Sequence, residues 1–139
     1  MKRYGTFHQL YFHFVWATQD RLPIITPEVE SRLFPYIGAK CKEWGYGLYA
    51  VNGIEDHLHI LVELTPTMLI ADVARNLKGA SSHYINKESG LGVTLYWQDG
   101  YGVVSIRKDD VPKVATYIRQ QKEHHASRKL SDVLERITL

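Results

Sequence analysis

The chain has 139 residues, of which 45% are apolar and 23% are charged. This composition is typical of a folded globular protein and excludes a disordered chain, so we expect one domain over residues 1–139. No apolar run approaches the roughly 18 residues of a membrane span, which predicts a cytoplasmic protein with no membrane partner. The net charge of +2 argues against an extended nonspecific contact with duplex nucleic acid.

The first two elements are a strand and a helix. Residues 8–18 favour a central strand, because apolar side chains occupy both of its faces. Thr26 and Pro27 form an N-cap and first-turn pair that begins a helix, and Pro35 is expected to kink that helix. Cys41, the only cysteine, falls on the apolar stripe of this helix, so we expect a buried thiol.

A hairpin is predicted next. Residues 46–52 indicate a short strand, and the pair Asn52-Gly53 predicts the turn into a second strand over residues 54–64. The two strands should therefore be antiparallel neighbours.

The remaining pattern completes a known arrangement of elements. A second helix is predicted from about Thr67 to Lys87, a short strand over residues 103–106, and a third helix from about Asp110. The first six elements follow the order of a ferredoxin-like βαββαβ sandwich of the α+β class, in which two helices cover one face of an antiparallel sheet. The first and third strands are central neighbours in that topology, and the third helix is an addition to it.

Two histidines separated by one residue are the most informative local feature. Strand side chains alternate between faces, so His57 and His59 share one face while Leu58 and Ile60 take the other. Imidazoles about 7 Å apart along a strand can converge on one cation. The solvated face of a sheet produces the same spacing, so a metal site also needs ligands from elsewhere.

The third helix offers such partners. Tyr117 and Gln121 are four residues apart, which places them on one flank of a helix about 6 Å apart along its axis. The amide oxygen is a hard ligand and the phenol is a nucleophile. A tyrosine that only packs against the core is the alternative. His124 and His125 lie nearby, either as spare ligands or as caps of the helix end.

Several segments in fixed order carry a family resemblance. They are residues 10–18, the motif Asp56-His57-Leu58-His59, residues 77–82, residues 97–102 with Ser105, and residues 117–121 followed by 123–125. With these segments the chain resembles the single-tyrosine HUH transposases, the IS200-like family of single-strand DNA transposases. The resemblance covers nearly the whole chain.

The resemblance implies a site and a reaction. It implies that His57, His59 and Gln121 bind a divalent metal, Mg²⁺ or Mn²⁺, and that Tyr117 is the nucleophile. The implied product is a 5′-phosphotyrosine link in single-stranded DNA whose ends fold into hairpins. It also implies a homodimer, in which the tyrosine helix of one subunit can complete the histidine site of its partner. Mixed nitrogen and oxygen ligands suit Mn²⁺ somewhat better than Mg²⁺.

Four residues are candidates for contact with DNA. Arg75 and Lys78 lie on the polar side of the second helix, and Trp97 and Tyr101 lie in the glycine-rich segment that follows it. Cations hold phosphates and aromatic rings stack on bases, which is the combination that single-strand binding uses. An ordinary solvated helix face is the alternative for the two cations.

Other functions remain open at this point. An RRM-like binding module without catalysis would use exposed rings such as Tyr11, Tyr49 and Trp97, but it leaves the histidines without a role. A replication initiator or relaxase nickase usually has a longer chain. A domesticated HUH nickase that acts on chromosomal repeat hairpins would differ from a mobile transposase in the DNA around the gene, because an insertion element has hairpins beside it.

Overall fold

The computed structural model describes residues 5–127 and 129–139. The strands are β1 (Leu10–Ala17), β2 (Gly47–Ile54), β3 (His57–Leu64) and β4 (Gly102–Ile106). The helices are α1 (Pro27–Trp44), α2 (Ile70–Lys87), α3 (Val111–Arg119), α4 (Gln121–Ser127) and α5 (Asp132–Glu135), with short 3-10 turns η1 (Gln19–Arg21) and η2 (Lys108–Asp110).

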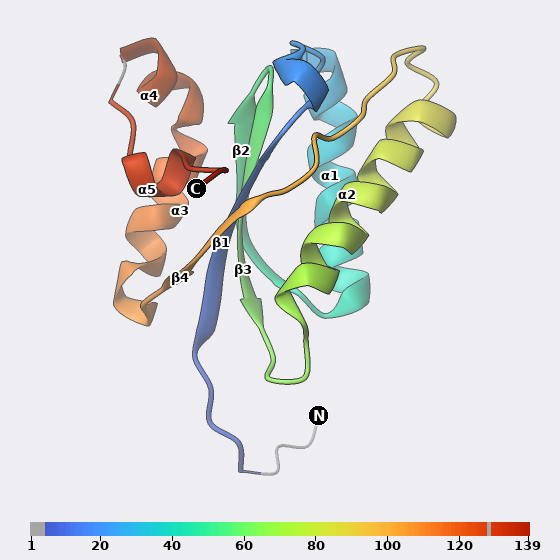
Figure 1. Cartoon of the computed structure of the whole chain (residues 1–139). Coiled ribbons are helices and arrows are strands. Elements are labelled where there is room, and N and C mark those ends of the chain that lie inside the picture. Colours follow the sequence, from blue (N-terminus) through green and yellow to red (C-terminus); the bar gives the residue numbers. More distant parts are fainter. Residues whose placement is uncertain (1–4, 128) are drawn as a thin grey trace.

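The four strands form one sheet in the order β2-β3-β1-β4, and each neighbouring pair is antiparallel. Helices α1 and α2 cover one face, and α3, α4 and α5 lie on the opposite face (Figure 1). The predicted α+β sandwich and its ferredoxin-like strand order are confirmed, with β1 and β3 at the centre. The face that two-helix sandwiches leave free is here covered by the C-terminal helices.

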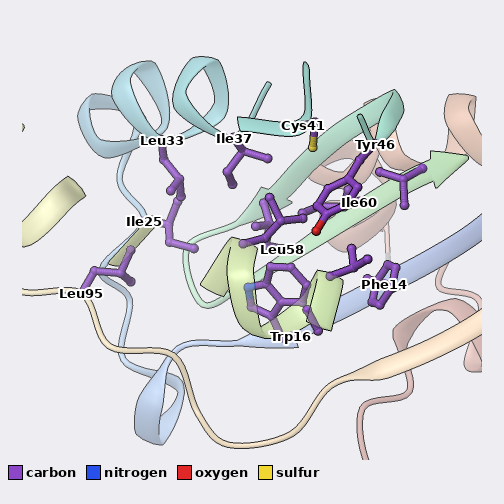
Figure 2. Close-up of a cluster of buried hydrophobic side chains, with 14 of the residues drawn as sticks. Phe14, Trp16, Ile25, Leu33, Ile37, Cys41, Tyr46, Leu58, Ile60 and Leu95 are labelled. Atoms are coloured by element: carbon purple, nitrogen blue, oxygen red, sulfur yellow. The ribbon is translucent and has the colours of Figure 1, made fainter. Parts of the chain in front are cut away.

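The larger part of the core lies between the sheet and α1 and α2. Alternate residues of β1 and β3, among them Phe14, Trp16 and Leu58, point into this layer and meet Leu33 and Ile37 of α1 (Figure 2). A second cluster joins the other face of the sheet to α3; its members are Tyr11, Ala50, Leu61, Val111, Val114, Ala115 and Ile118. The sheet is therefore packed on both faces, and the side chains that β3 directs toward α3, such as Leu61, are buried.

The predicted helix start and buried thiol are confirmed. The Thr26 hydroxyl accepts a hydrogen bond from the Val29 amide at 3.3 Å, as an N-cap should. The helix continues as one element through Pro35. Cys41 is buried, and burial raises the pKa of its thiol to about 12. Among the described residues, no helix is long and apolar enough to cross a membrane.

The predicted hairpin turn at Asn52-Gly53 is wrong. β2 runs to Ile54, and the turn falls on Glu55 and Asp56. Gly53 serves a different purpose, since a Cβ atom there would lie 2.1 Å from the carbonyl oxygen of His57 on the paired strand. Glycine is therefore required at this position because two backbones approach closely, and not because a turn needs a left-handed conformation.

The third helix is shorter than expected. It ends at Arg119, and Gln120, with φ −98° and ψ 23°, separates it from α4. Tyr117 and Gln121 therefore do not share one continuous helix. The axial spacing that predicted their proximity does not apply, and what brings them together is described below.

Candidate active site

His57 and His59 project from β3 toward the C-terminal helices. Leu58 and Ile60 point to the opposite core, as the alternation predicted. Both histidines are buried, with 3% and 0% exposure. Burial of two imidazoles on a face that also carries a hydrophobic cluster excludes the alternative that they are ordinary solvated residues.

Their ring nitrogens converge with two further donors, His125 of α4 and Glu135 of α5. One donor atom from each of the four residues lies within 4.8 Å of all the others. Glu135 Oε1 is 3.1 Å from His57 Nε2, 3.2 Å from His59 Nε2 and 3.4 Å from His125 Nε2. Imidazole nitrogens and a carboxylate oxygen gathered in this way are suited to hold a divalent cation.

The far nitrogen of each strand histidine has its own partner. His57 Nδ1 lies 2.8 Å from Asp56 Oδ1, and His59 Nδ1 lies 2.8 Å from His13 Nε2. A partner at Nδ1 fixes the ring orientation and directs the Nε2 lone pair toward a ligand. Consistent with this, His57 Nε2 is buried, and its 3.1 Å contact with Glu135 Oε1 lacks hydrogen-bond geometry, as do its contacts with the other described residues.

The electrostatics of the cluster centre on one carboxylate. Burial alone would favour the neutral acid, but contacts with His57 and His59 outweigh it and hold the pKa of Glu135 well below its usual range. Burial opposes protonation of His57, yet the Glu135 and Asp56 carboxylates raise its pKa. Burial lowers the pKa of His59, and it lowers the pKa of His13 to about 3. His13 is thus a neutral hydrogen-bonding partner.

Tyr117 meets the cluster through the same carboxylate. Its hydroxyl donates to Glu135 Oε2 at 2.5 Å and accepts from the Ser131 amide at 3.0 Å. Burial, and then the contact with Glu135, raises the pKa of Tyr117 to about 12. The His124 ring stacks on the Tyr117 ring with centroids 4.5 Å apart. The phenol is therefore protonated at neutral pH and fixed on several sides.

Gln121, like His59, is a fully buried polar residue of this layer. Its Nε2 donates to Glu135 Oε2 at 3.1 Å, and its Oε1 lies 3.1 Å from His125 Nε2. Gln121 thus contacts both C-terminal donors of the cluster. Although the helix breaks before it, Gln121 and Tyr117 meet at one carboxylate.

Comparison with known proteins identifies the family. The family model described as "Transposase IS200 like" matches residues 6–121. This chain belongs to the IS200-like transposases. The ISDra2 transposase TnpA of Deinococcus radiodurans is 26% identical over 125 residues, which cover 86% of this chain and 89% of that protein. The transposase for insertion sequence element IS200 of Salmonella typhimurium is 26% identical over 117 residues, or 81% of this chain and 76% of that protein.

Solved structures give the same result. A putative transposase from Deinococcus radiodurans superposes with a TM-score of 0.68 at 27% identity, covering 87% of this chain and 97% of its own. A REP-associated tyrosine transposase, whose structure contains a bound REP hairpin, superposes with a TM-score of 0.64 at 16% identity, covering 90% of this chain and 74% of its own. The second likeness shows the shared fold.

The RRM-like alternative does not suit this transposase fold. Tyr11, one of the rings it would use, is buried against α3 in the second core cluster. Trp97 packs on the main core and donates from Nε1 to Ser81 Oγ at 2.9 Å. Tyr49 is the one ring of these three that is exposed, at 40%, and a single ring on a sheet face covered by helices gives no platform for several stacked bases.

The four residues expected to contact DNA gather around one groove of about 430 Å³ between α2 and the segment before β4; they are Arg75, Lys78, Trp97 and Tyr101. Lys78 donates to the carbonyls of Gln98 and Gly100 at 2.8 and 2.9 Å. The Tyr101 ring packs against Phe14 of the transposase core. Lys78 therefore holds the loop in place.

A larger groove, of about 790 Å³, opens between β4, α3 and α5, and Tyr117 lies on its wall. Arg107 and Lys113 line it with exposed cationic side chains. Neither these two cations nor His13 and Glu135 are among the residues that the sequence patterns predict for the site. Strand alternation does indicate where His13 points, because it places His13 on the same face of the sheet as Tyr11 and on the opposite face from Phe14.

Proposed function

We propose that this transposase cleaves and rejoins single-stranded DNA through a covalent bond between Tyr117 and a 5′ phosphate. One observation carries the proposal. The Tyr117 hydroxyl and the Nε2 atoms of His57 and His59 meet on the two oxygens of one carboxylate. A single side chain, Glu135, therefore contacts both the nucleophile and the candidate metal centre.

His57 and His59 would hold a divalent cation, with the Gln121 oxygen as the third protein ligand. The buried Nε2 of His57 supports this assignment, because it lies 3.1 Å from Glu135 Oε1 yet has no hydrogen bond of good geometry to any described residue, and a buried nitrogen in that state costs free energy unless it binds a ligand. The donor set of imidazoles and hard oxygens suits Mn²⁺ or Mg²⁺. When bound, the cation neutralises charge on the scissile phosphate and on the leaving oxygen.

Tyr117 supplies the covalent step. Its oxygen forms a bond to phosphorus while the bond from phosphorus to the 3′ oxygen breaks, and the proton lost by the phenol is balanced by the proton that the 3′ oxygen gains. Glu135 Oε2 is the acceptor nearest to that phenol proton. The phosphotyrosine bond retains the energy of the phosphodiester, so the strand is rejoined elsewhere without ATP.

The DNA partner is proposed to be single-stranded, with hairpin ends. The REP-associated relative with the same fold is bound to a REP hairpin, which supports this class of partner. Arg75 lies beside the smaller groove, and Lys113 beside the groove that contains Tyr117. We propose that the strand follows the second groove to the nucleophile and that the hairpin contacts the first.

The homodimer implied by the family resemblance remains a prediction. In one chain, Tyr117 already reaches the carboxylate that contacts His57 and His59. We therefore propose that each subunit of such a dimer has a complete site of its own. The extra C-terminal helices then belong to the active site of their own chain.

The test is covalent trapping. The protein is incubated with Mn²⁺ and labelled single strands taken from the DNA that flanks its gene, and a denaturation-resistant protein–DNA band is sought. Tyr117→Phe should abolish the band while the protein stays folded, because the ring that packs beside His124 is retained. Tyr36→Phe, on the distant helix α1, should retain it. A band from Tyr117→Phe, or equal cutting of duplex, would refute the mechanism.

A further inference from the structure

We propose that Glu135 is itself a ligand of the metal ion and that the same carboxylate holds Tyr117 beside that ion. The inference rests on the proposed function and extends its ligand set with a residue from the C-terminal segment. The two carboxylate oxygens have different partners: Oε1 contacts the histidine nitrogens, and Oε2 contacts Tyr117 and Gln121.

The separations at Oε1 suit shared coordination. Adjacent ligands of an octahedral cation with bonds of about 2.1 Å are about 3 Å apart. Glu135 Oε1 lies 3.1 Å from His57 Nε2 and 3.2 Å from His59 Nε2. The His57 nitrogen makes no hydrogen bond within the described residues despite that distance. Two ligands of one ion lie side by side in this way, close together but not aligned as donor and acceptor.

The chemistry of a carboxylate ligand is favourable here. Two neutral imidazoles and an amide leave the full charge of a divalent cation uncompensated in a buried site, which is costly. An anionic oxygen removes half of that charge and is the ligand type that Mn²⁺ and Mg²⁺ prefer. His57, His59, Gln121 and Glu135 together still leave coordination positions free for a DNA phosphate.

The second oxygen positions the nucleophile. Tyr117 donates to Oε2 at 2.5 Å, and the Ser131 amide donates to the Tyr117 oxygen at 3.0 Å. The phenol oxygen is therefore held between the start of α5 and its end. Because one carboxyl group is only a few ångströms wide, a Glu135 bound through Oε1 fixes Tyr117 next to the ion.

The segment that delivers Glu135 is packed in place. The Ser131 hydroxyl caps α5 by accepting from the Leu134 amide at 3.2 Å, and Leu134 packs against the second core cluster. A Cβ atom on Gly102 of β4 would lie 2.0 Å from the carbonyl oxygen of Arg136. The chain after α5 thus lies directly on the edge strand, beside the sheet (Figure 1). These contacts fix the position from which the Glu135 side chain extends to the histidines.

A competing role predicts results of opposite sign. If the Glu135 carboxylate only occupied the place of a DNA phosphate, metal and DNA would displace it. Removing it would then leave metal affinity unchanged or tighter and would increase cleavage. If Glu135 is a ligand, its removal weakens metal binding and decreases cleavage.

The first measurement is calorimetric titration of Mn²⁺ into the full-length protein. Glu135→Gln should weaken Mn²⁺ binding at least about tenfold, as loss of a supporting group at a metal site commonly does. Glu135→Asp, with its shorter side chain, should weaken it as well. Asp132→Asn is the matched control, since Asp132 is an exposed carboxylate on the same short helix. Unchanged affinity in Glu135→Gln would overturn the proposal.

The second measurement follows the segment itself. Trypsin cleaves after Arg136, an exposed residue directly after Glu135. Mn²⁺ should slow this cleavage in the wild-type protein and in Asp132→Asn, but not in Glu135→Gln. Faster cleavage of the wild-type protein in Mn²⁺ would mean that the ion displaces the segment, and the proposal would be wrong.

Both measurements are independent of DNA cleavage. If Mn²⁺ binds through Glu135 and no Tyr117 adduct forms on any strand, the proposed function fails and the ligand assignment stands. If the adduct forms and Glu135→Gln binds Mn²⁺ as tightly as the wild type, the function stands and the ligand assignment fails.

Discussion

His13 Nε2 lies 2.8 Å from His59 Nδ1, across the central strand pair of the sheet. Burial lowers the pKa of His13 to about 3, so the ring is neutral and its Nε2 can accept the Nδ1 proton of His59. That tautomer of His59 presents a lone pair at Nε2 toward the donor cluster. His13 is thus a positioning residue for the proposed metal centre.

His13→Leu should weaken Mn²⁺ binding about 10- to 100-fold, because the ring orientation and tautomer of His59 are no longer fixed. His13→Gln retains an acceptor oxygen and should recover part of the affinity. Calorimetric titration measures both variants, and thermal unfolding monitored by circular dichroism tests their folding. Equal affinities for the leucine and glutamine variants would show that the His13 contact has no such role.

The Cys41 thiol should be inert in the folded protein. Burial raises its pKa to about 12, so at pH 8 thiolate is a minute fraction of the total. Iodoacetamide should modify Cys41 only after denaturant unfolds the chain, which mass spectrometry measures. Rapid modification under native conditions would mean that α1 separates readily from the sheet.

Gly53 should not tolerate alanine. The added methyl group would meet the His57 carbonyl at 2.1 Å, so β2 and β3 would have to separate at the start of the histidine strand. We expect a loss of about 1–3 kcal/mol in unfolding free energy and weaker Mn²⁺ binding. Gly79→Ala is the control, because a Cβ at that position in α2 would meet no described atom within 4 Å apart from its own stretch of helix backbone. It should be neutral or stabilising by up to about 1 kcal/mol.

The contrast between predicted and unpredicted parts of the site follows from sequence distance. His57 and His59 could be assigned to one face because strand alternation is a local rule. Tyr117 and Gln121 do lie together, but they meet at the Glu135 carboxylate and not through helical spacing, because the helix breaks between them at Gln120. Glu135 could not be found in this way, because its contact with His59 spans 76 residues and depends on how the C-terminal segment packs.

The same reasoning applies to the fold. The order of elements was readable from hydrophobic periodicity, and it determined the strand order. The predicted hairpin turn is misplaced because Asn-Gly usually marks a turn. Gly53 is needed here for a close cross-strand contact, which exists only after β2 and β3 have paired. The covering of the second face by α3 was also not predicted, since nothing local to its apolar stripe indicates which surface receives it.

Complementation between two inactive variants tests where the site assembles. If each chain uses its own Tyr117 with its own His57, then a mixture of Tyr117→Phe and His57→Ala chains has no complete site in any dimer. Such a mixture should form no DNA adduct, even after subunit exchange has been demonstrated with differently tagged chains. Restored adduct formation would show that the tyrosine and the histidines come from different subunits.

Lys113 should contribute to strand binding at the groove that contains Tyr117. Its side chain is exposed and lines that groove, so its charge can pair with a phosphate. Lys113→Ala should weaken binding of a single-stranded oligonucleotide and should lower the slope of log K against log salt by about 0.7, the value for one lost phosphate contact. Fluorescence anisotropy at several salt concentrations measures both quantities. Lys87, exposed at the end of α2 on the opposite layer, provides the matched control. If Lys87→Ala and Lys113→Ala reduce the slope equally, the strand does not follow this groove.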